Sequence, residues 1–122
     1  MSKKNLFPGD IVIVEYTPQN DPSTIKARPA LIISSQSFHC DNLDVIILVI
    51  TSVVRYSKSS EIVIKDNDSF FHQTGLKVTS SIRCGSICSF PKAKIHRRIG
   101  TVPQHILKDA VKRLVGFLEY SK

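Results

Sequence analysis

The chain contains no apolar run approaching the ~20 residues that a membrane-spanning helix needs. Its basic N-terminal segment runs into the turn-forming Pro8-Gly9-Asp10, where a signal peptide would continue with an apolar stretch. Internal repeats, low-complexity segments and an obvious linker are also missing, and 122 residues fit one domain. We therefore expect a single domain over residues 1–122, a cytoplasmic location and no membrane partner.

Cysteine is scarce, and its spacing excludes two common uses. The three cysteines, Cys40, Cys84 and Cys88, are an odd number, so at least one thiol is unpaired. Cys84 and Cys88 fall in one predicted strand, where four residues span roughly 13 Å, too far for a disulfide or a shared tetrahedral metal. The spacing is also not that of a zinc site. We expect no metal centre and interpret the cysteines as small apolar residues in a reduced core.

Negative charge is in short supply. Lys and Arg number 17 against 10 Asp and Glu, which gives a formal net charge of +7. Such a balance favours a polyanionic partner, which means nucleic acid, an anionic surface or an acidic protein segment. A solvated basic surface explains the same charge, so the charge alone selects no function.

Short apolar runs predict strands over residues 11–16, 30–33, 45–50, 61–64 and 79–90. The third run is continuously apolar and branched, as in a strand buried on both faces. In the last run the apolar phase passes through Ile82 and Cys84 and slips to Ile87, with Gly85 between, which predicts a β-bulge. Several short strands with one bend favour a small, strongly curled antiparallel barrel.

One helix is expected at the C-terminal end, since Thr101-Val102-Pro103-Gln104 matches a capping box with proline near the first helical position. Apolar residues then recur at helical spacing and form one stripe: Ile106, Leu107, Ala110, Val111, Leu114, Phe117 and Leu118. Strands followed by one long helix are typical of the α+β class.

Two of the predicted strands bring an arginine and a threonine together. If the runs on either side of residues 35–44 pair as antiparallel neighbours, the natural register sets Ser34 against Val45 and Arg28 against Thr51. Opposed Cβ atoms lie about 5 Å apart, and a slip of one residue would separate the faces. A guanidinium and a hydroxyl suit a phosphate that gains charge in a transition state. The alternative is a strand-edge cation beside an ordinary strand end.

Ordered sequence blocks carry a resemblance to a known family. They cover residues 7–12, 26–33, 45–52, 75–76, 80–84 and 99–100, and include Gly9-Asp10, Arg28-Pro29 and Thr51-Ser52. Together they resemble the MazF/PemK toxins. The resemblance implies a CcdB/PemK-like, SH3-like barrel with a C-terminal helix, acting as a homodimer. It also implies a metal-independent endoribonuclease without cofactor, which cuts single-stranded RNA at short sequences and leaves a 2′,3′-cyclic phosphate.

The same resemblance assigns three catalytic candidates. Arg28 matches the family's arginine before proline and would stabilise the developing charge, while Thr51 would bond the phosphate. Arg83 resembles an arginine that some members use near the scissile phosphate. Those members carry an acidic residue two positions later, where this chain has Gly85, so the proton-transfer group is left open. Histidine is the residue type that most often transfers protons near neutral pH, so His39 and His72 are further candidates, although both fall in predicted loops.

RNA contacts are predicted at Lys26, Ser52 and Ser81 within the family-like blocks, and at Lys92 and Lys94. The last two belong to a basic cluster at residues 92–98 that either follows an RNA backbone or forms a solvated turn before the helix. The aromatic pair at residues 70–71 either stacks on unpaired bases or packs against the barrel.

A toxin of this kind implies an antitoxin partner, acidic and partly disordered, that covers the basic groove. Gly85 motivates an alternative: a non-catalytic binder on the same fold, such as a CcdB-like gyrase poison or a cleavage-dead RNA-binding relative. Arg28 with Thr51 argues against the gyrase poison, which needs no phosphate clamp. A structural SH3-like module is a third hypothesis.

Overall fold

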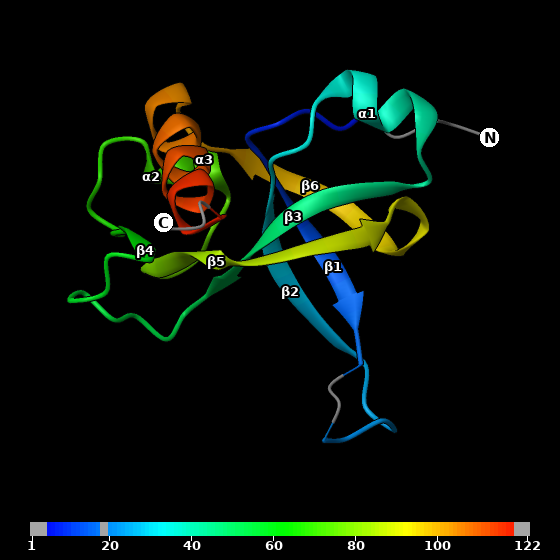
Figure 1. The fold of residues 1–122 in the computed structure, drawn as a ribbon. Helices are drawn as coiled ribbons and strands as arrows, with labels where there is room; N and C mark the ends of the chain where they lie inside the picture. Colours follow the sequence, from blue (N-terminus) through cyan, green and yellow to red (C-terminus); the bar gives the residue numbers. More distant parts are fainter. Residues whose placement is uncertain (1–4, 18–19, 119–122) are drawn as a thin grey trace.

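The structure is a computed structural model that describes residues 5–17 and 20–118. Six antiparallel strands form one sheet in the order β4-β5-β3-β2-β1-β6. The strands are β1 (Asp10–Tyr16), β2 (Lys26–Ile32), β3 (Asp44–Thr51), β4 (Glu61–Ile64), β5 (Ser80–Pro91) and β6 (Ile95–Thr101). The helices are α1 (Gln36–Asp41), α2 (Phe71–Thr74) and α3 (Gln104–Leu118), with a 3₁₀ turn, η1 (Lys92–Lys94). Figure 1 shows α2 and α3 beside β4 and one half of β5, with α1 toward the other end of the sheet.

All five predicted strands are present, and the α+β class is confirmed. The sixth strand, β6, was missed because only its first residue, Ile95, is buried, and exposed His96, Arg97 and Arg98 follow it. A strand at the sheet edge needs no strict apolar alternation, and charged side chains are frequent there. Helices α1 and α2 were also missed, since six and four residues are too short to show helical periodicity.

Both faces of the central strands are covered, as the unbroken apolar run in β3 predicted. Leu48 and Ile50 face a core shared with Phe71 of α2 and with the buried residues Leu107, Ala110 and Leu114 of α3, which we call the helix-side core. On the opposite face, a second core consists of Leu6, Val12, Val14, Ala30, Ile32, Val45, Ile47 and Ile95. Every residue of this second core except Leu6 belongs to a strand, so the curl of the sheet itself encloses it.

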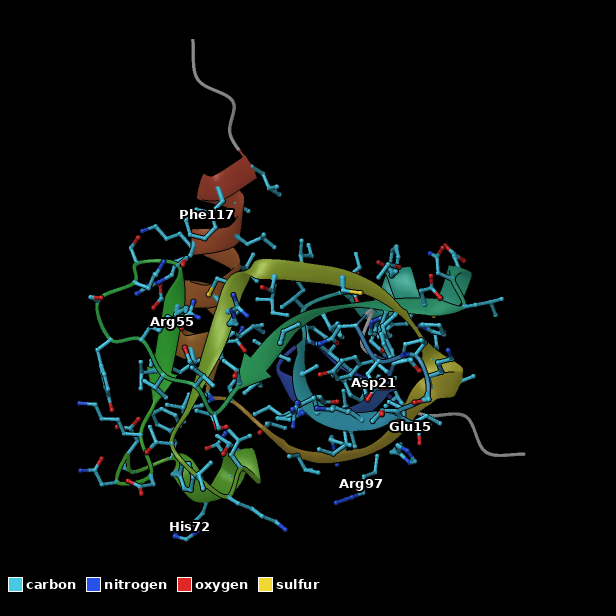
Figure 2. All side chains as sticks on the ribbon, turned by 90° about the horizontal axis from the view of Figure 1, so that it is seen from below. Glu15, Asp21, Arg55, His72, Arg97 and Phe117 are labelled. Atoms are coloured by element: carbon cyan, nitrogen blue, oxygen red, sulfur yellow. The ribbon has the colours of Figure 1, made fainter. Side chains whose placement is uncertain are left out.

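The predicted bulge in β5 is present and is larger than a single-residue slip. Leu48 pairs with Ile87, yet the next residue of β3, Val49, pairs with Arg83. Three residues, 84–86, are inserted between those two pairs. The insertion bends β5 into the long arc seen in Figure 2. One half of the strand thereby pairs with β3 alone, and the other half also pairs with β4.

Two details of the prediction are corrected. The described strands form an open order with β4 and β6 at its ends, so the pairing gives a curled sheet and not a closed barrel. The predicted capping box does not form, because Thr101 belongs to β6 and its hydroxyl accepts a hydrogen bond from Gln73 at 3.2 Å. Instead, the Pro103 carbonyl accepts the first helical bonds of α3. No helix in the described part of the chain is long and apolar enough to cross a membrane.

Two glycines let α2 and β6 touch backbone to backbone. Gly75 ends α2 in the left-handed region at φ 73°, and a Cβ there would lie 2.1 Å from the Ile99 carbonyl oxygen. A Cβ on Gly100 would lie 2.3 Å from the Gln73 oxygen and 2.4 Å from that of Thr74. This contact holds α2 against the edge strand β6.

Replacing Gly100 by alanine should therefore force α2 away from β6 and lower the free energy of unfolding by about 1–3 kcal/mol. Gly116, in the exposed part of α3, provides the matched control, because a Cβ there meets nothing within 4 Å. Gly116→Ala should raise stability by up to about 1 kcal/mol through helix propensity. Urea titration measures both, and a Gly100→Ala variant as stable as the parent would contradict the contact.

The cysteines differ in environment. Cys84 is fully buried in the helix-side core, whereas Cys40 and Cys88 are exposed, so the expectation of core cysteines holds for one of the three. Burial raises the pKa of the Cys84 thiol to about 11. The thiolate is the reactive form, so Cys84 is inert at neutral pH.

An alkylating reagent at about pH 8 should modify Cys40 and Cys88 of the native protein rapidly and Cys84 only after denaturation. Peptide mass spectrometry identifies the modified thiols. Equal rates at all three positions in the folded protein would contradict the burial of Cys84.

Candidate active site

The register of β2 and β3 is the one that the sequence predicted. Ala30 faces Val49, Leu31 faces Leu48 and Ile32 faces Ile47. Continued toward the start of β2, this register sets Arg28 against Thr51. Since side chains alternate along a strand, Arg28 shares the face of Ala30, and Thr51 shares the face of Ile47. Both therefore project on the side of the second core, just beyond its end.

A hollow of about 430 Å³ opens there between β2, β3 and β5. Its floor is apolar, with Val14, Ala30 and Ile47 among the lining residues. Its polar groups include Arg28, Thr51 and Arg83, so the structure brings the three catalytic candidates to one place. A neighbouring hollow of about 440 Å³ is also lined by Arg28 and Thr51, together with Ser52.

The arginine and threonine are both available for a ligand. The Arg28 side chain is exposed and has no ion-pair or hydrogen-bond partner among residues 5–17 and 20–118. The Thr51 oxygen accepts the Val53 N–H at 3.1 Å, which orients the hydroxyl and leaves its proton free to be donated. A permanent cation and an oriented donor at one hollow can hold a phosphate.

The third candidate, Arg83, forms an ion pair with Glu61, a carboxylate that the sequence analysis did not single out. Glu61 lies directly opposite Arg83 in the β4–β5 ladder, and their charged atoms are 3.7 Å apart. The Glu61 side chain is only 4% exposed, and it also lies 3.9 Å from Arg55. It accepts a hydrogen bond from Ser81 at 2.9 Å. The buried Glu61 carboxylate thus holds Arg83 at the edge of the hollow. It comes from a different strand than Gly85, the position at which some family members carry an acidic residue.

The remaining predicted RNA contacts are dispersed. Ser52 is exposed at the second hollow, and Lys26 is exposed at the start of β2. Ser81 is fully buried and donates to Glu61, so its hydroxyl is engaged inside the fold. In η1, Lys92 donates to the carbonyl of His39 while Lys94 is exposed. Residues 95–98 of the basic cluster belong to β6, not to a turn.

Neither histidine candidate lines either of these hollows. His39 is buried in α1, where Nδ1 donates to the Leu6 carbonyl at 2.9 Å and Nε2 is hydrogen-bonded to the Ser34 hydroxyl at 2.5 Å. The ring thus connects Leu6 to the end of β2. His72 is exposed on α2 (Figure 2). Phe71 is buried in the helix-side core and Phe70 packs against it, so packing is the role of the aromatic pair.

The loop after β1 is organised locally by an acid. Asp21, labelled in Figure 2, accepts hydrogen bonds from the hydroxyls of Thr24 and Ser23. These bonds, that of Thr24 foremost, lower the pKa of the Asp21 carboxyl. A lowered pKa means that this local order is complete above the ordinary pKa of aspartate and is lost as the pH falls through the lowered value. At neutral pH the Asp21 carboxylate therefore keeps its hydrogen bonds to Ser23 and Thr24.

Comparison with known proteins identifies the family of the chain. A profile of the PemK-like, MazF-like toxins of type II toxin–antitoxin systems matches residues 7–118. The chain belongs to this family. No curated protein matches the chain.

Solved structures of similar fold cover nearly the whole chain. MazE–MazF (Form-II) from Deinococcus radiodurans has a TM-score of 0.77 at 16% identity, covering 98% of this chain and 100% of that chain. An endoribonuclease in complex with its cognate antitoxin from Mycobacterial species has a TM-score of 0.71 at 17% identity, covering 96% and 100%. Mycobacterium tuberculosis toxin MazF-mt6 has a TM-score of 0.65 at 20% identity, covering 89% of this chain and 99% of that chain. At such identities the similarity is one of fold.

Removing the Glu61 carboxylate tests the support beneath Arg83. Glu61→Ala leaves the buried Ser81 hydroxyl without its acceptor, which costs about 1–3 kcal/mol. The arginines are half exposed and regain water, so their ion pairs add little. Glu61→Gln keeps an acceptor and should cost less than about 1 kcal/mol. Urea titration distinguishes them, and equal stability of the two variants would contradict the buried hydrogen bond.

Proposed function

We propose that this toxin is a metal-independent endoribonuclease that cuts single-stranded RNA, with Arg28 and Thr51 as the phosphate-stabilising pair. The observation that carries the proposal is the unpartnered guanidinium of Arg28 in one hollow with the oriented hydroxyl of Thr51. Arg83 lines the same hollow, and Glu61 holds it. Family membership and the endoribonuclease named among the structural neighbours support the reaction class.

In the proposed reaction the RNA 2′-oxygen attacks the adjacent phosphorus. The 2′-hydroxyl loses its proton as the 2′-O–P bond forms, and the 5′-oxygen takes up a proton as the P–O5′ bond breaks. The products are a 2′,3′-cyclic phosphate and a 5′-hydroxyl. Negative charge grows on the non-bridging oxygens, where Arg28 and Thr51 stabilise the transition state. Arginine holds its proton too tightly to act as a base, so its role is electrostatic. The apolar floor of the hollow strengthens that interaction by excluding water.

The proposal extends to partners. We expect a homodimer in the cytoplasm and an acidic antitoxin that covers the basic hollows, since the net charge is +7. Among the neighbours of similar fold, the mycobacterial endoribonuclease is in complex with its cognate antitoxin, which supports a partner of this kind.

Arg28→Ala and Thr51→Val should each reduce the single-turnover cleavage rate of a mixed-sequence RNA about 10²–10³-fold, as loss of one transition-state donor does elsewhere. Arg28→Lys should fall between, because it keeps the charge and loses the planar fork. Lys108→Ala removes an exposed cation of α3, remote from the hollows, and should cleave like the parent. Activity is measured in EDTA.

Full activity of folded Arg28→Ala would refute the assignment. If the parent protein binds RNA and leaves it uncut over a wide pH range, the cleavage-dead binder is the correct description. Capture of gyrase without RNA binding would instead point to the gyrase-poisoning alternative.

A further inference from the structure

A third hollow, of about 230 Å³, lies next to the candidate active site, on the side of β4. It is lined by Arg55, Lys58, Ser60, Glu61, Arg83 and Ser86, with Gly85 completing the wall. Figure 2 places Arg55 on this side, away from Glu15 and Asp21 near the β1–β2 loop. Of the residues proposed to contact RNA, only Arg83 belongs to this hollow.

The charges at this hollow do not cancel. Among the described residues, Glu61 is the only carboxylate in its lining, while Arg55, Lys58 and Arg83 supply three cations. Lys58 is exposed and makes no ion pair within residues 5–17 and 20–118. Arg113 of α3, which donates to the Glu61 backbone carbonyl, is balanced by Asp109 at 3.0 Å. The hollow therefore keeps a positive excess that an anion would neutralise.

The lining also suits a phosphate better than a base. Hydroxyls of Ser60 and Ser86 stand beside the cations as further donors, and aromatic side chains are missing from the wall. A Cβ on Gly85 would meet nothing within 4 Å, so the bulge leaves open space where an acidic residue would otherwise repel an anion. Both arginines are about half exposed, at 50% and 42%, and can be reached from solvent.

Arg83 connects this hollow to the active site, because its side chain lines both. An RNA strand with one phosphate at Arg28 and Thr51 can therefore place another of its phosphates at this second cationic hollow. We propose that the Arg55–Lys58 hollow binds a second phosphate of the same single-stranded RNA. The proposal rests on the proposed function. It gives Gly85 a role, that of keeping the second hollow open to an anion.

Binding to a 2′-O-methyl RNA oligonucleotide of mixed sequence, which lacks the attacking hydroxyl, tests the subsite without cleavage. Arg55→Ala/Lys58→Ala should weaken binding about tenfold or more at low salt. It should also make the slope of log K against log salt shallower by about 0.7 for each phosphate that the variant no longer neutralises. The matched control, Lys108→Ala/Lys112→Ala, removes the same charge from the exposed face of α3 and should leave the slope unchanged.

Equal affinity and slope for the two double variants would overturn the subsite, since the effect would then be one of net charge. Lys58→Glu, which should weaken binding further, guards against a folding defect in the Arg55 variant, and thermal melts confirm the fold of each. If the hollow variants lose binding while ordinary RNA is never cut, the subsite stands and the nuclease proposal fails. If Arg28→Ala abolishes cleavage and the hollow variants bind normally, the nuclease proposal stands and the subsite proposal fails.

Discussion

The bend of β5 is the constraint on which the rest of the architecture depends. The three residues inserted opposite the Leu48–Val49 step allow one strand to serve two pairings, with β3 along its length and with β4 at its beginning. Cys84, at the bend, enters the helix-side core, while its neighbour Arg83 projects from the opposite face. Without the three inserted residues, β5 would run straight and the sheet would lose much of its curl. The bulge therefore positions both a core residue, Cys84, and a residue of the candidate site, Arg83.

A sheet covered on both faces leaves little room for polar groups. In the central strands β1, β2 and β3, charge can gather only near a strand end, because elsewhere each side chain faces one core or the other. Arg28 near the start of β2 and Thr51 at the end of β3 occupy such positions, while Glu61 lies at the start of β4 and Arg83 beside the bulge. Their convergence follows from antiparallel pairing, which brings the start of one strand beside the end of the next. The apolar floor beneath them is the end of the second core.

The sequence predicted what depends on alternation, and missed what depends on distant contacts. The β2–β3 register followed from the loop that connects the two strands, and with it the placement of Arg28 opposite Thr51. Glu61 escaped notice because an acid at the head of a short strand is usually solvated, and only the fold shows it enclosed by Arg55, Arg83 and Ser81. The bounds of β6 were equally hidden, since an edge strand of exposed cations resembles a loop. Gly75 and Gly100 were noticed as family-like residues, and the backbone contact between α2 and β6 explains why no side chain fits there.

The pairing of β1 with β6 joins the beginning of the chain to its end, since Asp10 faces Thr101 and the Val102 N–H bonds to the Gly9 carbonyl. During synthesis, β1 can pair with β2 early, but its other edge stays bare until residues beyond 100 have left the ribosome. The helix-side core likewise waits for α3. Contacts between such distant segments slow folding and delay it until β6 and α3 have been synthesised. A nascent chain that stops short of these two elements can therefore complete neither core.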